Sequence, residues 1–264
     1  VMKAIIFTDL DASLLHEETF SCIEIIDTLN ALRSDGVLIV PNTSKTEVET
    51  RHVLKLLNFT TPFIVENGAK FCDIHHMPYF TDEMDKAIGI PVSELGIRLD
   101  KLGDLSFHND FQPLLKMQRD VASQILGLSG AALEQALNRR FSLLYRYTGS
   151  QSKIPFWHNA ASKVGLNLSQ GGRVFALSGP HNKATPIQWF SKKLISMQYT
   201  APKIIAIGDS NNDKPMLLAA AIACVIPRLN GSSLALPEHP SVVFAEEPAP
   251  FGWQDAAKKA LEML

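Results

Sequence analysis

Cysteine is scarce in this sequence, and the three residues present, Cys22, Cys72 and Cys224, lie far apart along the chain. This spacing provides neither a disulfide framework nor a zinc-binding pattern, and it is typical of a protein kept in a reducing compartment. The chain also lacks a membrane-spanning run, because uncharged stretches such as 215–227 fall short of the ~20 apolar residues needed. We therefore expect a cytoplasmic protein with no membrane segment.

An excess of positive charge is missing as well. The 264 residues include 25 Lys and Arg against 27 Asp and Glu, which gives a formal net charge of −2. A chain with this balance has no basic surface to attract nucleic acid or an anionic membrane, so we expect neither as a partner. Hydrophobic residues make up 46% of the chain, which is enough for a sizeable buried core and excludes a disordered protein. The oligomeric state is left open.

Short apolar runs alternate with helical patterns at both ends of the chain. Runs of β-forming residues at 4–7, 37–40 and 63–65 are separated by helical periodicity, and a similar run at 203–207 precedes another helical stretch. Continuous apolar runs of this length are typical of strands buried on both faces of a parallel sheet. We predict an α/β fold with a Rossmann-like parallel-sheet core, in which 63–65 is the third strand of a βαβαβ unit.

The alternation of strands and helices is lost in the middle of the chain. There the sequence carries helical stretches and turn signals without clean strand–helix repeats. We predict that residues 1–82 and 175–264 form one discontinuous core domain. Residues 83–174 would then form an inserted α+β cap domain, whose ends a sequence pattern places only to within several residues.

Acidic residues follow two of the predicted core strands. Asp9 and Asp11 come directly after the first strand, and Asp209 and Asp213 come after the strand at 203–207. Because ligands of open parallel sheets bind beyond the carboxyl ends of the strands, we expect these four side chains to converge. An all-oxygen cluster without His or Cys suits Mg²⁺. A single Asp here is as readily explained as a helix N-cap, but the whole set favours a metal site.

Two carboxylates that lie two positions apart suit a division of labour on a phosphoester. One carboxylate, from Asp9 or Asp11, can attack phosphorus while its neighbour protonates the leaving alcohol. Lys183 would neutralise a phosphate oxygen, and the hydroxyl of Thr43 with nearby backbone N–H groups would complete a phosphate site. These residues predict phosphoryl chemistry.

The same residues resemble the motifs of the haloacid dehalogenase (HAD) phosphatases. Residues 9–13 (Asp-Leu-Asp-Ala-Ser) are similar to motif I, normally DxDGT, and residues 43–45 (Thr-Ser-Lys) are similar to motif II. Lys183 fits motif III, and residues 208–213 (Gly-Asp-Ser-Asn-Asn-Asp) fit motif IV. The four motifs occur in the family's order and at the predicted strand ends, so together they are specific although each alone is weak.

This resemblance implies a role for each acidic residue. Asp9 would be the nucleophile and Asp11 the general acid and base. Mg²⁺ would be held by Asp9, the backbone carbonyl of Asp11 and Asp209, with Asp213 as a supporting acid.

The insert resembles the C2-type cap of the Cof-like branch, and within that branch the chain is similar to mannosyl-3-phosphoglycerate phosphatases. The segments that carry this likeness are 43–46, 66–69, 140–142 and 171–173. Arginines in the cap would hold a substrate carboxylate, although a solvated surface position is the usual alternative for an arginine. The narrower resemblance implies a substrate site made of Ser44, Lys45, Asn67, Arg140, Ser142 and Arg173.

The sequence departs from the family pattern in three places. Ala12 and Ser13 replace the usual Gly and Thr of motif I, and Asn182 stands where Asp is usual. Residues 143–144 are Leu-Leu where Glu-Pro is expected. These departures bear on the identity of the sugar more than on the core chemistry.

The expected function is that of a Mg²⁺-dependent phosphatase acting on a phosphorylated sugar. It would hydrolyse mannosyl- or glucosyl-3-phosphoglycerate through an aspartyl-phosphate intermediate and release a compatible solute. One alternative is a Cof-like phosphatase with another or broader sugar-phosphate substrate, and a phosphomutase would share the first step. A catalytically silent sugar-phosphate sensor is disfavoured, because Asp9, Asp11, Asp209 and Lys183 are all present.

Overall fold

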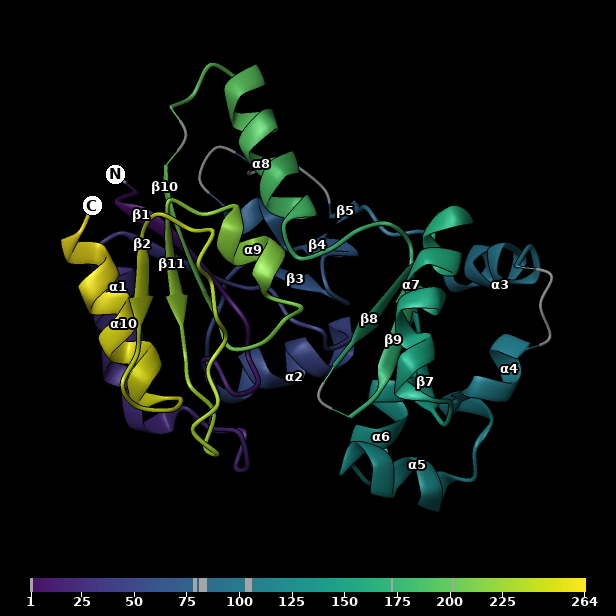
Figure 1. Ribbon diagram of the computed structural model, residues 1–264. Helices are drawn as coiled ribbons and strands as arrows, with labels where there is room; N and C mark the ends of the chain where they lie inside the picture. Colours follow the sequence, from purple (N-terminus) through teal and green to yellow (C-terminus); the bar gives the residue numbers. More distant parts are fainter. Residues whose placement is uncertain (1, 78–79, 81–84, 103–105, 172, 201) are drawn as a thin grey trace.

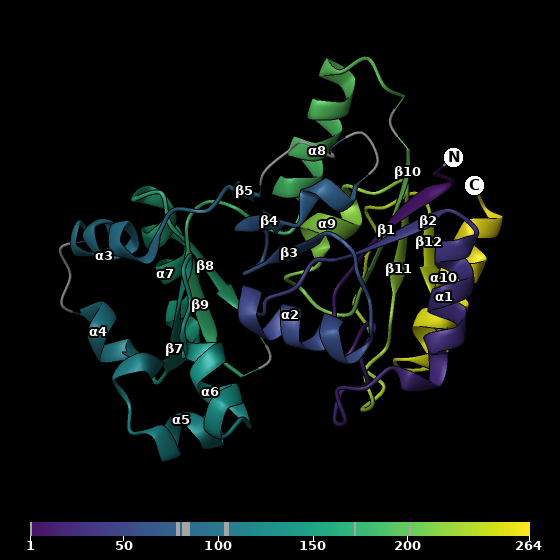
Figure 2. The same ribbon diagram turned by 180° about the vertical axis from the view of Figure 1, so that it is seen from behind.

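The computed structural model describes residues 2–77, 80, 85–102, 106–171, 173–200 and 202–264. The chain forms two lobes that lie side by side, and both ends of the chain lie on the same lobe (Figures 1 and 2). We call this lobe the core and the other lobe, made from the middle of the chain, the cap.

A five-stranded parallel sheet with the order β12-β11-β10-β1-β2 forms the centre of the core. Every residue of the central strand β1 is buried, which explains its unbroken apolar run. Strands β1 and β10 run in register to their ends, with Thr8 opposite Ile207. The strands of this sheet are β1 (Ala4–Thr8), β2 (Val37–Pro41), β10 (Lys203–Gly208), β11 (Ile222–Val225) and β12 (Val242–Phe244).

Helices cover both faces of this sheet and enclose a separate apolar layer on each side. Side chains of α1 (Ile26–Ser34), α2 (Glu47–Leu56) and α10 (Phe251–Glu262) pack in one layer. Those of α8 (Thr185–Ser196) and α9 (Lys214–Leu218) pack in the other. In the described part of the chain, no helix has both the length and the apolar character required to cross a bilayer.

The segment predicted as the third core strand joins a different sheet. β3 (Phe63–Val65) pairs antiparallel with β4 (Lys70–Cys72), which pairs with β5 (Lys86–Ala87), and one parallel bridge between Asn42 and Ile64 links β3 to the main sheet. The turn after β3 explains the difference, because the chain folds back there with positive φ angles at Glu66 and Asn67. The prediction of a full third parallel strand was therefore wrong.

The cap is built on a four-stranded antiparallel sheet with the order β6-β7-β9-β8. Residues of α3 (Val92–Asp100) and α7 (Ile154–Lys163) pack with one set of sheet side chains, and residues of α5 (Arg119–Leu126) and α6 (Gly130–Leu137) pack with another. This arrangement confirms the predicted fold class, an α/β core with an α+β insert. The remaining cap elements are α4 (Ser106–Asp110), β6 (Phe111–Pro113), β7 (Ser142–Tyr147), β8 (Asn167–Gln170) and β9 (Phe175–Ser178).

The chain crosses between the lobes twice. It leaves the core after β5, which pairs with β4, and it returns after β9, which pairs with both β7 and β8 of the cap. Both crossings thus lie a few residues after the predicted boundaries at 82 and 175, and residues 81–84 lie outside the described part of the chain.

Candidate active site

Three acidic side chains meet where β1 and β10 end. Asp9 follows β1 and Asp209 follows β10, and because these strands are parallel neighbours in register, their carboxyl ends lie at the same edge of the sheet. Asp9 is 6% exposed, Asp209 is 5% exposed and Asp213 is fully buried. One carboxylate oxygen from each of the three lies within 4.8 Å of the other two. The sequence predicted this convergence.

Lys183 lies between two of these carboxylates and has no exposed surface. Its Nζ lies 2.9 Å from Asp9 Oδ1 and 2.6 Å from Asp213 Oδ1. Burial alone would lower the pKa of this ammonium, but the two carboxylates override that effect and raise the pKa above its ordinary value. Asn42 Nδ2 donates to the backbone carbonyl of Lys183 at 2.8 Å, which holds the main chain of the lysine in place. Lys183 is therefore a buried cation held between two carboxylates.

Asp209 is held by two residues that the sequence analysis did not identify as site residues. Ser13 Oγ donates to Oδ1 at 2.9 Å, so the serine that replaces the usual threonine keeps a motif hydrogen bond. Arg228 donates to Oδ2 from Nε at 2.9 Å, its Nη2 forms an ion pair with the same oxygen at 2.7 Å, and its Nη1 lies 3.4 Å from Glu17 Oε1. Arg228 lies shortly after β11, so applying the strand-end rule to that strand would have identified it.

Asp213 organises the loop that follows β10. Its Oδ1 accepts from Lys183, while its Oδ2 accepts from the backbone N–H groups of Asp209 at 3.1 Å and Ser210 at 3.0 Å. With both oxygens engaged inside the protein, this carboxylate suits a supporting role better than direct contact with a substrate.

The acidic cluster carries more negative charge than its surroundings easily satisfy. Burial raises the pKa of Asp9 to about 8, with Lys183 opposing the rise and the neighbouring carboxylates reinforcing it. Burial and then Asp213 likewise raise the pKa of Asp209 to about 6, against the effect of Arg228. A further cation would relieve this repulsion. The oxygen donors of Asp9 and Asp209 therefore fit a hard divalent metal ion.

Asp11 lies beside this cluster and is only partly satisfied. Its Oδ2 forms an ion pair with Lys45 Nζ at 2.8 Å. Its Oδ1 is buried and has no hydrogen-bond partner among the described residues. Burial would lower the pKa of Lys45, but the ion pair with Asp11 overrides this effect and raises it. The pair therefore presents one free carboxylate oxygen next to a stable cation.

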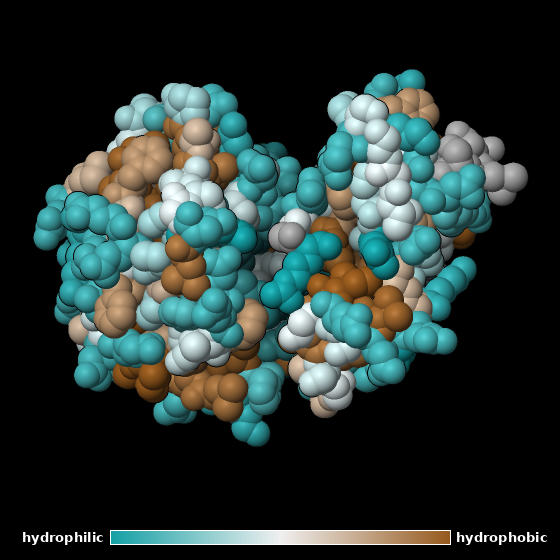
Figure 3. All heavy atoms as spheres, turned by 60° about the horizontal axis from the view of Figure 1, so that its bottom comes forward, coloured by the Kyte–Doolittle hydropathy of each residue, from teal (hydrophilic) through white to brown (hydrophobic). Residues whose placement is uncertain are grey.

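A cleft of about 280 Å³ separates these core residues from the cap. Figure 3 shows the hollow between the lobes, with apolar surface on the cap beside it. Asp9, Asp11 and Asp209 line its core side, whereas Thr43 and Lys183 are buried and do not line it. The cap contributes apolar side chains and two arginines, namely Leu126, Leu128, Leu144, Val174, Ala176, Arg139 and Arg173.

The cleft contains four of the six residues predicted to bind substrate: Ser44, Lys45, Asn67 and Arg173. Arg140 is exposed and lies outside the cleft, and Ser142 is buried with its hydroxyl donating to Glu66. Arg139 faces the cleft in place of its neighbour. These residues lie between the end of α6 and the start of β7, where no periodicity indicates which of two adjacent arginines points inward. Gly172, next to Arg173, lies outside the described residues.

Core and cap are joined by reciprocal polar contacts beside the cleft. Glu66 of the core accepts from the backbone N–H groups of Arg140 at 2.9 Å and Phe141 at 3.1 Å, as well as from the Ser142 hydroxyl. In the opposite direction, Arg139 of the cap donates from Nη2 to the backbone carbonyl of Ser44. We call this group of contacts the junction. It connects the motif II loop directly to the cap.

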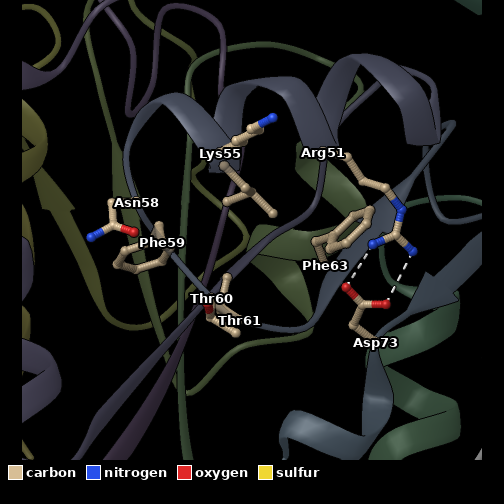
Figure 4. Close-up of a pocket in the computed structure, with 9 residues that line it drawn as sticks. Arg51, Lys55, Asn58, Phe59, Thr60, Thr61, Phe63 and Asp73 are labelled. Carbon is tan, nitrogen blue, oxygen red and sulfur yellow. Dashed lines mark hydrogen bonds and ion pairs between the residues drawn. The ribbon is translucent and has the colours of Figure 1, made fainter.

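A second cavity of the core, lined by residues of α2 and the segment after it, has different chemistry (Figure 4). The guanidinium of Arg51 stacks over Phe63, with 4.9 Å to the ring centroid, and donates to both oxygens of Asp73 at 2.8 and 3.0 Å. Arg51, one of the two cationic side chains that line this cavity, is therefore already paired with a carboxylate.

The comparisons with known proteins agree with this geometry. Residues 6–94 match the family model described as haloacid dehalogenase-like hydrolase. A protein of Persephonella marina called glucosyl-3-phosphoglycerate/mannosyl-3-phosphoglycerate phosphatase is 29% identical, with 98% of each chain covered. A protein of Methanococcoides burtonii with the same name is 28% identical, over 97% of this chain and 96% of the other.

A solved structure supports the fold alone. The haloacid dehalogenase-like hydrolase from B. subtilis superposes with a TM-score of 0.65 at 19% identity, and the whole of both chains is covered. The likeness thus extends over both lobes, including the cap.

Proposed function

Because the chain is a haloacid dehalogenase-like phosphatase, a phosphoric monoester hydrolase as its motifs predicted, we propose that it hydrolyses glucosyl- or mannosyl-3-phosphoglycerate. The observation that carries the proposal is a cleft in which Asp9 lies among cationic side chains, in a chain that matches relatives named for this activity over nearly their whole length. Such a substrate carries a phosphate and a carboxylate. The cationic side chains that line the cleft are Lys45, Arg139, Arg173 and Arg228, of which Lys45 is paired with Asp11 and Arg228 with Asp209.

In the proposed reaction, Asp9 attacks phosphorus and the substrate alkoxide leaves. Oδ1 of Asp9 is held by the Leu10 N–H at 2.8 Å and by Lys183, and no described residue donates to Oδ2, which is the attacking atom. The product of this step is an aspartyl phosphate. Lys183 holds the nucleophile in one orientation and stabilises the negative charge that develops around it.

Asp11 moves the protons in both halves of the reaction. In the first half, its unpaired Oδ1 gives a proton to the leaving oxygen of the glycerate. In the second half, the same oxygen takes a proton from a water that attacks the aspartyl phosphate, which releases inorganic phosphate and regenerates Asp9. Lys45 keeps the Asp11 side chain in place through Oδ2.

The metal-binding residues in this proposal are Asp9, Asp209 and the backbone carbonyl of Asp11. Mg²⁺, when bound there, supplies charge neutralisation for the phosphate oxygens. Ser13 and Arg228 hold the Asp209 carboxylate in position.

The test is a measurement of phosphate release from glucosyl-3-phosphoglycerate, mannosyl-3-phosphoglycerate, 3-phosphoglycerate and a hexose 6-phosphate. We expect the highest kcat/KM with a glycosyl-3-phosphoglycerate, loss of activity with chelator and recovery with Mg²⁺. Asp9→Asn should retain less than about 10⁻⁴ of the parent rate, the scale of loss when a hydrolase nucleophile is removed. Circular dichroism serves as the folding control.

Each other outcome points to a different function. Preference for the hexose phosphate would favour the broader sugar-phosphate phosphatase. Binding of these substrates without phosphate release would favour the silent sensor. Near-parental turnover by a folded Asp9→Asn protein would refute the nucleophile assignment.

A further inference from the structure

We propose that the glycosyl group of the substrate binds in a second cavity, which adjoins the cleft, between the cap and the loop after β10. We call this cavity the side pocket. It is formed by α7, the end of β8 and the loop 209–213, and its volume is about 520 Å³, within the range of about 300–1,000 Å³ usual for small-molecule sites. The inference rests on the proposed function and adds where the sugar lies.

The side pocket and the phosphate cleft are neighbours that share part of their lining. Ser169, Gly171, Ser210, Asn212 and Arg228 line both of them. In a glycosyl-3-phosphoglycerate, the carbon that bears the sugar is bonded directly to the carbon that bears the phosphoester. A sugar attached there can enter the side pocket while phosphorus remains next to Asp9.

The lining of the side pocket suits a neutral polyol. His158, Gln170 and Asn211 project from three different segments, and none of their side chains hydrogen-bonds to another residue in the part of the chain that the structure describes. Amide and imidazole groups offer both donors and acceptors, as sugar hydroxyls require. Of the described residues that line this pocket, Arg228 alone carries a fixed charge, and Asp209 already pairs with it.

Another part of the cleft wall is unsuitable for a sugar. There the cap presents Leu126, Leu128, Leu144 and Val174, and Figure 3 shows apolar surface on the cap beside the hollow. Hydroxyl groups placed against these side chains would lose hydrogen bonds to water and gain none in return. The polarity of the two walls therefore directs the ring toward α7 and β8.

The experiment compares glucosyl-3-phosphoglycerate with 3-phosphoglycerate, which has the same phosphate and carboxylate but no sugar. We define the specificity ratio as kcat/KM for the first substrate divided by kcat/KM for the second. Gln170→Ala and Asn211→Ala should each lower this ratio about 2- to 10-fold, the effect of losing one neutral hydrogen bond. Gln188→Ala, an exposed glutamine on α8, is the matched control and should leave the ratio unchanged.

A blocking variant makes the test independent of any single hydrogen bond. Gln170→Trp places a bulky ring in the side pocket and should lower the specificity ratio more than Gln170→Ala does. The proposal is overturned if Gln170→Ala and Gln170→Trp both keep the parental specificity ratio. It is also overturned if Leu128→Asn, on the apolar wall of the cleft, lowers the ratio while the two Gln170 variants do not. Failure of the proposed function looks different, because the parent chain would then show no preference for the glycosyl substrate at all.

Discussion

Core and cap both place side chains in or beside the cleft, but the core examples are held more rigidly than the exposed cap examples. Asp9, Asp209 and Lys183 of the core are 6%, 5% and 0% exposed, and each is fixed by at least two polar contacts. Arg173 of the cap is exposed and donates to a single backbone carbonyl, that of Leu126. Gln170 is also exposed, and its side chain makes no hydrogen bond to a described residue.

This difference suggests that the buried core side chains serve the chemical step and the exposed cap side chains serve substrate recognition. Buried charges that are fixed before the substrate arrives need no reorganisation during the reaction, which favours stabilisation of the transition state. Solvated side chains on the cap can rotate and can be exchanged with little effect on folding, since function resides in sites carried by the fold. Substitutions of the buried core charges should therefore impair folding and every reaction, whereas those of exposed cap side chains that face the substrate should change only the choice of substrate.

The largest effect should come from Lys183→Met in the core. Removal of this ammonium leaves Asp9 and Asp213 buried without their shared cation. Breaking a buried ion pair from one side costs about 3–5 kcal/mol, so we expect that loss in the free energy of unfolding measured by urea denaturation. Activity should fall on every phosphoester tested.

A lysine of the cap is the matched control for this variant. Lys153 pairs with Asp110 at 3.2 Å but is 54% exposed, and Asp110 also accepts from Trp157. Lys153→Met should therefore change stability by no more than about 1 kcal/mol. If Lys183→Met and Lys153→Met lost similar free energies of unfolding, burial of the lysine would not explain the difference expected between core and cap.

The next effect should come from the junction, through Glu66→Gln. This change keeps the side-chain shape but removes the charge that receives the N–H groups of Arg140 and Phe141. A hydrogen bond to a charged group contributes about 1.5–3 kcal/mol, so stability should fall within that range. The loss of kcat/KM should be larger on a glycosyl-3-phosphoglycerate than on p-nitrophenyl phosphate, because binding of the small ester depends less on the cap.

Glu94 provides the control, because it is a half-buried acid of α3 whose partner is Arg98 on the same helix. Glu94→Gln should leave kcat/KM unchanged on both the glycosyl-3-phosphoglycerate and p-nitrophenyl phosphate. An equal kinetic loss on the two substrates for Glu66→Gln would mean that the junction supports the core rather than the placement of the cap.

Two arginines of the cap, Arg173 and Arg140, test recognition alone. Arg173 lines the cleft, so Arg173→Ala should lower kcat/KM on glycosyl-3-phosphoglycerate about 10- to 150-fold, the equivalent of one charge-assisted hydrogen bond. The loss on p-nitrophenyl phosphate, which has no carboxylate, should be much smaller. Arg140→Ala should affect neither substrate, since its side chain lies outside the cleft. Parental activity in Arg173→Ala would exclude a carboxylate clamp at this position.

The sequence was most informative where the backbone determines the outcome. Parallel strands place their carboxyl ends together, so Asp9 and Asp209 could be brought together from strand order alone. The apolar run of Phe63–Val65 was misleading, because a buried strand looks the same in either sheet. The turn at Glu66 and Asn67 decided its pairing, and positive φ angles at such residues leave little trace in a sequence.

Side-chain direction in irregular segments was beyond sequence reasoning. Arg139 and Arg140 are chemically identical, and only the path of the chain between α6 and β7 turns one of them into the cleft. Arg228 was missed for another reason, because it follows β11, a strand end that the prediction left out, and no short motif links it to Asp209. The direction of Arg139 and Arg140, by contrast, depends on tertiary packing rather than on local pattern.

The smallest effect should come from Ala12, where the chain departs from the glycine usual in motif I. Ala12 has a φ of 58°, a left-handed conformation that glycine adopts freely and alanine only at a cost. Ala12→Gly should therefore raise the free energy of unfolding by up to about 1 kcal/mol, the gain being limited by the greater freedom of glycine in the unfolded chain. The opposite sign is expected for Ala132→Gly on the exposed face of α6, which should cost about 1 kcal/mol. Destabilisation of equal size at both positions would show that the loop after Asp11 is not strained, and that the alanine is accommodated there as readily as in a helix.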